Sequence, residues 1–178
     1  MTELAKEYGA GLYELATEEN LREELCEQLD ALAECFRKDP DFLRLLNTHG
    51  IPLQERFSVL DEVLLGKVHP YILNFMKILC ERGAVSAFAE CAQYYRCRFN
   101  EDFGIGEALV STAAPLSRDQ AEALRRKLES ISGKRIRMRE SVDPKLLGGV
   151  RVELDGRRLD NTIQSRLEQL RRSLTGSF

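Results

Sequence analysis

The paired glycines Gly148-Gly149 are the part of the sequence that comes nearest to a ligand-binding motif. A phosphate-binding loop needs the pattern G-x-x-x-x-G-K-[ST], in which backbone N–H groups, a lysine and a hydroxyl surround the phosphates. The glycine pair is instead followed by Val150-Arg151-Val152, which alternates like a strand, and the G-x-G-x-x-G dinucleotide fingerprint does not fit there either. We therefore predict that the two glycines form a bend or bulge at the start of a strand, where glycine permits a positive φ.

The histidines and cysteines offer little chemistry for catalysis or metal binding. His49 and His69 lie in predicted loops beside Gly or Pro, away from any nucleophile or acidic pair that could complete a catalytic site. The five cysteines are odd in number and show no C-x-x-C spacing, which argues against a disulfide framework and a zinc site. We therefore expect a protein that is not an enzyme, with no catalytic residue, no cofactor and no metal, and with reduced thiols.

A basic stretch, KRIRMR at 134–139, is the best candidate for binding nucleic acid. Arg135, Arg137 and Arg139 alternate with apolar residues, which predicts a half-buried strand with one basic face. Base stacking needs aromatic residues, and the sequence after residue 104 contributes only Phe178. The strand could equally pair with an acidic protein partner or face water. An RNA-associated two-domain factor that uses this strand is therefore the alternative to a protein-binding function.

Apolar residues recur at helical spacing throughout the first 104 residues. Short breaks such as KDPD, THGIP and GKVHP separate the periodic segments, so we predict an α-helical N-terminal six-helix bundle. The expected helices cover residues 4–15, 21–36, 42–46, 53–64, 72–79 and 88–103.

The pattern changes after FGIG at 103–106 and predicts a small C-terminal α/β domain. Ser117 with Gln120 predicts a capping box, Gly133 ends the helix that follows, and Asp155-Gly156 predicts a hairpin turn. The elements expected here are a strand at 107–116, a helix at 118–131, strands at 135–139 and 150–154, and a helix at 163–174.

Charge divides the chain at the same place. Residues 1–104 carry 19 acidic and 11 basic residues, a net charge of −8, whereas residues 105–178 carry 10 acidic and 15 basic residues, a net charge of +5. We therefore predict two domains, 1–104 and 105–178, with different partners. The N-terminus lacks an apolar signal-peptide core and no run approaches about 18 apolar residues, so we expect neither a signal peptide nor a membrane span.

Several short motifs occur in one particular order along the chain. They are EYGAGLYELATEEN at 7–20, Asn74-Phe75, Arg82-Gly83, Ala114-Pro115-Leu116, Val142-Asp143-Pro144, Gly148-Gly149-Val150, Asp160 and Arg166-Leu167-x-x-Leu170. In this order and spacing the sequence resembles, nearly from end to end, the delta subunit of bacterial F-type ATP synthase, whose mitochondrial relative is the oligomycin-sensitivity-conferring protein. It departs from the family pattern at Asp160-Asn161-Thr162, where the family usually shows Asp-Gly-Ser, and at Gly9 and Gly11, where alanines are common.

The resemblance implies a non-catalytic connector (stator) in the peripheral stalk of the enzyme complex. The N-terminal domain would bind alpha subunits of the catalytic head, and the C-terminal domain would bind b-type stalk subunits, so that rotation of the central shaft drives ATP synthesis. The implied location is the cytoplasmic face of the cell membrane, with contact to the membrane only through the complex, and no nucleic acid is implied. The coupling ion is a proton or sodium.

The resemblance also implies sites. In the family an amphipathic segment of an alpha subunit lies between the first and fifth helices, in the helix-in-groove mode of recognition. The matching residues here are Tyr8, Leu12, Leu15, Ile72, Phe75, Met76 and Leu79, and a place in the plain bundle core is the alternative for each of them. The implied stalk contacts are Arg166, Leu167, Leu170 and Arg171, and the implied structural motif is Asp143, Pro144, Gly148, Gly149, Val150 and Asp160.

Overall fold

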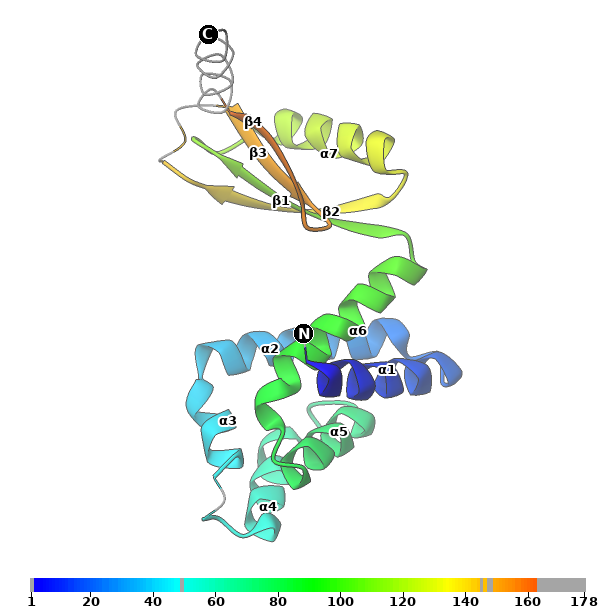
Figure 1. Cartoon of the computed structure of the whole chain (residues 1–178), viewed down its shortest axis with the longest axis vertical. Helices are drawn as coiled ribbons and strands as arrows, with labels where there is room; N and C mark the ends of the chain where they lie inside the picture. Colours follow the sequence, from blue (N-terminus) through cyan, green and yellow to red (C-terminus); the bar gives the residue numbers. More distant parts are fainter. Residues whose placement is uncertain (1, 49, 145, 147–148, 163–178) are drawn as a thin grey trace, which may run out of the picture. The chain divides into compact units, whose positions relative to one another are not determined.

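The computed structural model describes residues 2–48, 50–144, 146 and 149–162, and the chain divides into two compact units, Met1–Phe99 and Asn100–Phe178 (Figure 1). The units divide after Phe99, whereas the sequence pattern changes after Gly104. The two positions differ because the last turn of the helix that ends at Asp102 belongs to the second unit. The Asn100 side chain donates a hydrogen bond to Glu107 Oε1 at 3.2 Å.

The first unit is helical, as the apolar periodicity predicted. Its elements are α1 (Glu3–Glu18), α2 (Arg22–Lys38), α3 (Pro40–Leu46), α4 (Leu53–Leu64), α5 (Pro70–Glu81), the 3-10 turn η1 (Val85–Ala87) and α6 (Phe88–Asp102). Prolines at the first helical positions of α3 and α5 start these helices, because the missing N–H has no partner there in any case.

Aromatic rings of α6 join this helix to α1 and α2. The ring of Tyr95 is fully buried and meets Tyr13 of α1 edge-on, with 5.0 Å between ring centroids. Phe88 meets Phe36 of α2 in the same way at 5.2 Å. The Tyr95 hydroxyl donates a hydrogen bond to the carbonyl of Arg22 at 3.1 Å, so its burial leaves no unpaired polar group. Burial also raises the pKa of Tyr95, which therefore stays protonated.

The second unit is an α/β layer, as the sequence predicted. It contains β1 (Ile105–Thr112), α7 (Arg118–Ser132), β2 (Arg135–Val142), β3 (Gly149–Leu154) and β4 (Arg157–Thr162). Among the described residues the four strands form one sheet in the order β2-β1-β3-β4, in which β1 and β2 are parallel and the other pairs antiparallel. The helix α7 connects the two parallel strands and lies against one face of the sheet (Figure 1).

Alternation along the strands decides which side chains meet α7. Ala108 and Val110 of β1, Ile136 of β2 and Val152 of β3 pack against Leu128 of α7 and form the buried core of the unit. The odd-numbered residues of the same strands point to the opposite face, which we call the open face. The predicted basic side of the 135–139 strand, with Arg135, Arg137 and Arg139 exposed, lies there.

The local turn and cap predictions are confirmed in this unit. The Ser117 hydroxyl and the Gln120 side chain form a reciprocal capping box, and Gly133 ends α7 with a positive φ of 69°. Asp155 and Gly156, with φ of 48° and 77°, form the two-residue turn between β3 and β4. The strand predicted at 107–116 is shorter than expected at its end, because the Thr112 hydroxyl bonds the carbonyl of Ala114 at 2.8 Å and closes a turn. The helix predicted at 163–174 lies outside the described residues.

Candidate partner-binding surfaces

The helix α1 presents two different faces. Its inner face, which includes Ala5, Leu12 and Ala16, is buried. The adjoining face carries residues that repeat every three or four positions, and we call them the α1 stripe: Leu4, Tyr8, Gly11 and Leu15. Leu4 is 36% exposed, and Tyr8 and Leu15 are half-buried, so this stripe offers apolar surface to a partner.

The helix α5 is held in place at its start and presents a second accessible stripe. His69 caps it, because Nδ1 accepts a hydrogen bond from the Tyr71 N–H at 3.3 Å, while the His69 N–H donates to Gln28 Oε1 at 2.6 Å. This histidine therefore acts as a helix cap. Tyr71, Asn74 and Ile78 follow one another along the outer side, and we call them the α5 stripe. Ile78 is 45% exposed.

The structure separates the residues predicted to contact the head into two groups. Tyr8 and Leu15 are half-buried and belong to the α1 stripe. The others lie inside the unit, each with at most 6% of its surface exposed: Leu12, Ile72, Phe75, Met76 and Leu79. Their burial matches the alternative of plain bundle core. Leu4 and Ile78, which the sequence reasoning did not select, are the exposed large apolar side chains of α1 and α5.

The two glycines of α1 have opposite surroundings. A Cβ added to Gly9 would lie 3.0 Å from Cδ1 of Tyr94 and 3.1 Å from the carbonyl oxygen of Cys91, both on α6. A Cβ added to Gly11 would meet nothing within 4 Å. Gly9 therefore permits a close approach of α1 and α6, whereas Gly11 leaves a flat place in the middle of the α1 stripe.

The start of α1 is tied to α6 by a carboxylate. Glu90 Oε2 accepts hydrogen bonds from the backbone N–H of Thr2 at 2.6 Å and from its hydroxyl at 3.1 Å. The backbone hydrogen bond from Thr2, followed by the side-chain one, lowers the pKa of Glu90. The same Thr2 hydroxyl accepts from the Ala5 N–H at 3.3 Å and caps the helix. The α1 stripe is therefore fixed at its first turn.

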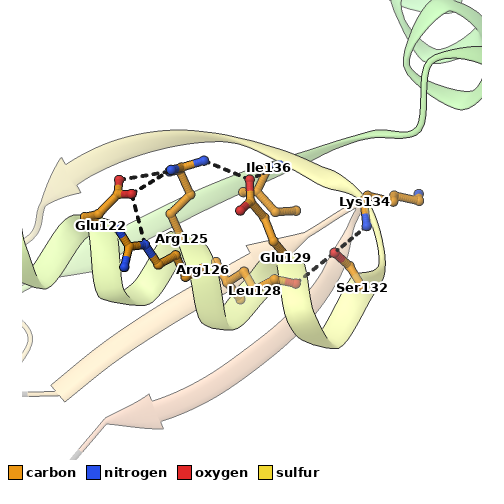
Figure 2. A network of polar contacts seen from close by, with 8 residues as sticks. All are labelled: Glu122, Arg125, Arg126, Leu128, Glu129, Ser132, Lys134 and Ile136. Atoms are coloured by element: carbon orange, nitrogen blue, oxygen red, sulfur yellow. Dashed lines mark hydrogen bonds and ion pairs between the residues drawn. The ribbon is translucent and has the colours of Figure 1, made fainter.

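In the second unit a chain of charged groups connects α7 to the edge strand β2 (Figure 2). Arg125 bonds Glu122 Oε1 at 2.7 Å and Glu129 Oε1 at 2.9 Å, and the hydrogen bond from Arg125 is the main reason that the pKa of Glu122 is lowered. Glu129 Oε1 also accepts the backbone N–H of Ile136 at 3.2 Å. A carboxylate of α7 thus occupies one of the backbone donors of β2 that β1 does not use.

The open face of the sheet is basic. Arg135, Arg137 and Arg139 are exposed, and among the residues that the structure describes no acidic group pairs with them. The register places Arg137 beside Glu107 and Arg139 beside Leu109 of β1. Leu109 is 45% exposed and Ile105 half-buried on the same face, so the β2 side of the face combines guanidinium groups with apolar side chains. Such a surface fits an acidic partner that carries some apolar residues.

Asp155 lies at one corner of the open face and is held there by hydrogen bonds. Asp155 accepts the N–H of Glu107 at 3.0 Å, and its other oxygen pairs with Lys134 Nζ at 2.7 Å. Partial burial raises the pKa of Asp155, but the hydrogen bonds from Lys134 and from the Glu107 N–H outweigh it, and the net pKa is lowered. The Asp155 side chain therefore fastens the β3–β4 turn to the start of β1.

The structural motif implied by the resemblance lies around the end of β2. The Asp143 N–H donates to the carbonyl of Thr112, and the Asp143 carbonyl accepts from Leu146, which is buried. Gly149 starts β3 with a φ of 87°, as expected of a bend, and Val150 is half-buried behind it. Pro144 is exposed, and Asp160 pairs in register with Arg151. Gly148 lies outside the described residues.

The remaining predicted contacts cannot be placed. Arg166, Leu167, Leu170 and Arg171 fall outside the described residues, as does His49.

Within the part of the chain that the structure covers, no cluster of three or more His, Cys, Asp or Glu residues is arranged to hold a metal ion. No helix in that part has the length and the apolar composition to cross a membrane. Burial raises the pKa of Cys91 to about 11, so this thiol is not a nucleophile at neutral pH.

Comparison with known proteins gives consistent results. The family model described as ATP synthase delta (OSCP) subunit matches residues 4–174. ATP synthase subunit delta of Desulfitobacterium hafniense is 30% identical over 172 residues, which cover 97% of this chain and 96% of the relative. The same subunit of Gloeobacter violaceus is 32% identical over 178 residues, with 97% and 95% covered.

A solved structure shares the fold. A chain in the cryo-EM structure of the Toxoplasma gondii mitochondrial ATP synthase hexamer aligns with a TM-score of 0.74 at 18% identity, and the alignment covers 98% of both chains. The helical unit followed by a small α/β unit is therefore an arrangement found in such an assembly. The match of the family model over nearly the whole sequence, together with the full-length relatives, shows that this chain belongs to the ATP synthase delta (OSCP) subunit family.

Proposed function

We propose that this protein is a non-catalytic connector in the peripheral stalk of an F-type ATP synthase. Its N-terminal unit, as a six-helix bundle, binds alpha subunits of the catalytic head, and its C-terminal α/β unit binds b-type stalk subunits. The connector holds the head still while the central shaft rotates, so that rotation drives ATP synthesis. It works at the cytoplasmic face of the cell membrane and meets the membrane only through the complex.

One observation carries this proposal, namely that the two units offer surfaces of different chemistry. The acidic first unit presents the apolar α1 and α5 stripes, and the second unit presents a basic open face. A joint between two unlike partners needs two unlike surfaces and no reactive centre. Membership of the ATP synthase delta family supplies the two partners.

At the head-side surface, an amphipathic helix of an alpha subunit lies along α1 and α5. The structure changes the choice of anchors: the accessible residues Leu4, Tyr8, Leu15 and Ile78 contact this helix, and the buried residues Leu12, Phe75 and Met76 support them from inside. Gly11 lets the partner backbone approach α1 closely, since it carries no side chain on the stripe.

Alanine substitutions test this surface. Leu4→Ala and Ile78→Ala are expected to weaken binding to catalytic heads that lack this subunit by about 1–3 kcal/mol, as interface anchors do, with the fold intact. Leu45→Ala is the matched control, because Leu45 is 40% exposed on α3, outside both stripes. Phe75→Ala is expected to lose about 3–5 kcal/mol of fold stability first, because its side chain is 5% exposed.

Binding is measured by titration of the purified heads and stability by urea unfolding of the same variants. Unchanged affinity in both Leu4→Ala and Ile78→Ala, or an equal loss in the Leu45→Ala control, would show that the head does not bind these stripes.

A further inference from the structure

We propose that the outer edge of β2, from Met138 to Val142, receives an extended acidic segment of a stalk subunit, which adds to the sheet as a further strand. This inference rests on the proposed function, because it takes the partner of the second unit to be a stalk subunit. Beyond the proposed function, the inference specifies the surface that binds the stalk subunit, and the conformation and charge of the bound segment.

The backbone of β2 leaves hydrogen-bonding groups free on one side. β2 is the first strand in the sheet order, and among the residues that the structure describes it has a strand neighbour only on the β1 side. The N–H of Arg135 donates to Gly104 and that of Asp143 to Thr112, both at 2.9 Å, so the odd-numbered positions face the β1 side. By the alternation of a strand, the N–H and C=O groups of Ile136, Met138, Glu140 and Val142 point outward.

Among the described residues, a side chain occupies an outward backbone donor only at the beginning of this edge. Glu129 of α7 accepts the outward N–H of Ile136, and its own position is fixed by Arg125 (Figure 2). No proline interrupts β2, and its ladder with β1 runs without a bulge from Arg135 to Val142. Natural edges are usually blunted by such devices along their length. An added strand can therefore start next to Met138 and run about 17 Å, the length of five extended residues.

The charges beside this edge define the occupant. The Arg137 and Arg139 side chains are exposed on the open face, where the register gives Arg137 the acidic neighbour Glu107 on the β1 side and Arg139 the apolar neighbour Leu109. A strand added to β2 places its alternate side chains about 4.5–5.5 Å from these arginines, where opposite charges stabilise the pair. The bound segment therefore carries Asp or Glu at alternate positions on that face.

Nucleic acid fits the same arginines less well. Single-stranded RNA is bound by bases that stack on aromatic rings. The described residues that point to the open face from β1, β2 and β3 include no aromatic side chain. A protein strand uses both the free backbone groups and the arginines, whereas RNA uses only the arginines.

Residue-resolved amide hydrogen exchange provides the test, on the full chain free and in the assembled ATP synthase. By the same alternation, the N–H groups of Met138 and Glu140 point away from β1, and those of Arg137 and Arg139 point toward β1. Assembly is expected to slow exchange at Met138 and Glu140 by at least about tenfold, with a much smaller change at Arg137 and Arg139. This alternation is the signature of an added strand.

Two substitutions test whether the outward backbone groups and the arginines of β2 bind the stalk segment. Glu140→Pro removes one outward N–H without touching the ladder to β1, since proline is tolerated on the open side of an edge strand. It is expected to abolish the protection of Met138 on assembly. Arg137→Glu is expected to weaken retention of stalk subunits by about tenfold or more, and Lys127→Glu, the same charge change on exposed α7 surface, is expected to leave it unchanged. If Glu140→Pro does not fold, the Arg137→Glu and Lys127→Glu pair decides.

The outcomes separate the two proposals. Alternating protection on assembly, lost in the variants, supports the added strand. Stalk subunits that co-purify with the chain without alternating protection overturn the strand and leave the proposed function standing. A chain that does not retain stalk subunits overturns both. The free chain is also measured with single-stranded oligouridine. If oligouridine slows exchange at β2 and assembly does not, the arginines bind nucleic acid and the inference is overturned.

Discussion

Gly9 and Gly11 of α1 allow one prediction in which the sequence context is nearly constant and only the packing differs. Both lie in the interior of the same helix, so replacing either by alanine gains a similar helix propensity, about 0.8–1 kcal/mol. The Cβ of Gly11→Ala meets no atom within 4 Å. We therefore expect this variant to be more stable than the natural chain by about 0.5–1 kcal/mol.

The same change at Gly9 acts against α6. Its Cβ would lie 3.1 Å from the carbonyl oxygen of Cys91, a backbone atom, and 3.0 Å from the ring of Tyr94. Relieving the overlap requires α1 and α6 to separate, and overpacking of this kind costs about 1–3 kcal/mol. After the propensity gain, Gly9→Ala is expected to be less stable than the natural chain by up to about 2 kcal/mol. The difference between the two variants isolates the packing of α1 on α6.

Urea unfolding followed by circular dichroism at a helical wavelength measures both free energies on the full chain. The slopes with denaturant should stay equal, so that the midpoints report stability. In a melt, 1 kcal/mol corresponds to about 4–8 °C for a unit of this size. If Gly9→Ala is stabilised as much as Gly11→Ala, the two helices are not in the close contact described, and the reasoning from the glycine is refuted.

Three further perturbations test the second unit and the connection to it. Ser117→Ala removes the cap of α7 and is expected to cost about 0.5–2 kcal/mol of stability, measured by urea unfolding, with Ser117→Asp as the rescuing control. Asp155→Asn keeps a residue that tolerates positive φ but loses the charge paired with Lys134. Because the folded pKa of Asp155 is lowered, its contribution is present above the unfolded value of about 3.9 and disappears as the pH falls through the folded pKa, so natural chain and variant should converge in acid. Limited proteolysis is expected to cut at Phe103-Gly104, where Phe103 is 49% exposed, and cleavage confined to α2 or α7 would contradict the division.

Much of the fold could be predicted because its signals are local. The Ser117–Gln120 box, the positive φ at Asp155-Gly156 and the alternation of Ile136 and Met138 each depend on residues a few positions apart. Their geometry is fixed by capping, turn sterics and strand periodicity before any tertiary contact forms.

The exposed residues of the head-side surface could not be predicted in the same way. Ile78 and Leu79 are adjacent aliphatic residues in a mostly apolar helix, so they look alike in the sequence although one is 45% exposed and the other fully buried. Leu4 was open to prediction, since it continues the spacing of Tyr8, Gly11 and Leu15 around the helix. The contact between Glu129 and the Ile136 N–H depends on how α7 lies beside β2, which no short pattern encodes.

The central place of β1 in the sheet has a consequence for the order in which the second unit folds. The segment from β1 through α7 to β2 closes on itself, as does the β3–β4 hairpin, and the pairing of β1 with β3 is the strand ladder that joins them. Partners in the β1–β2 ladder are 30 residues apart and those in the joining ladder 38 to 46, so the joining ladder is expected to form last. On the ribosome, β1 therefore keeps one bare edge until Leu154 has been made. A pause in translation shortly before that residue leaves Val110 and its neighbours able to pair with another nascent chain, and synonymous codons in this stretch become relevant to yield.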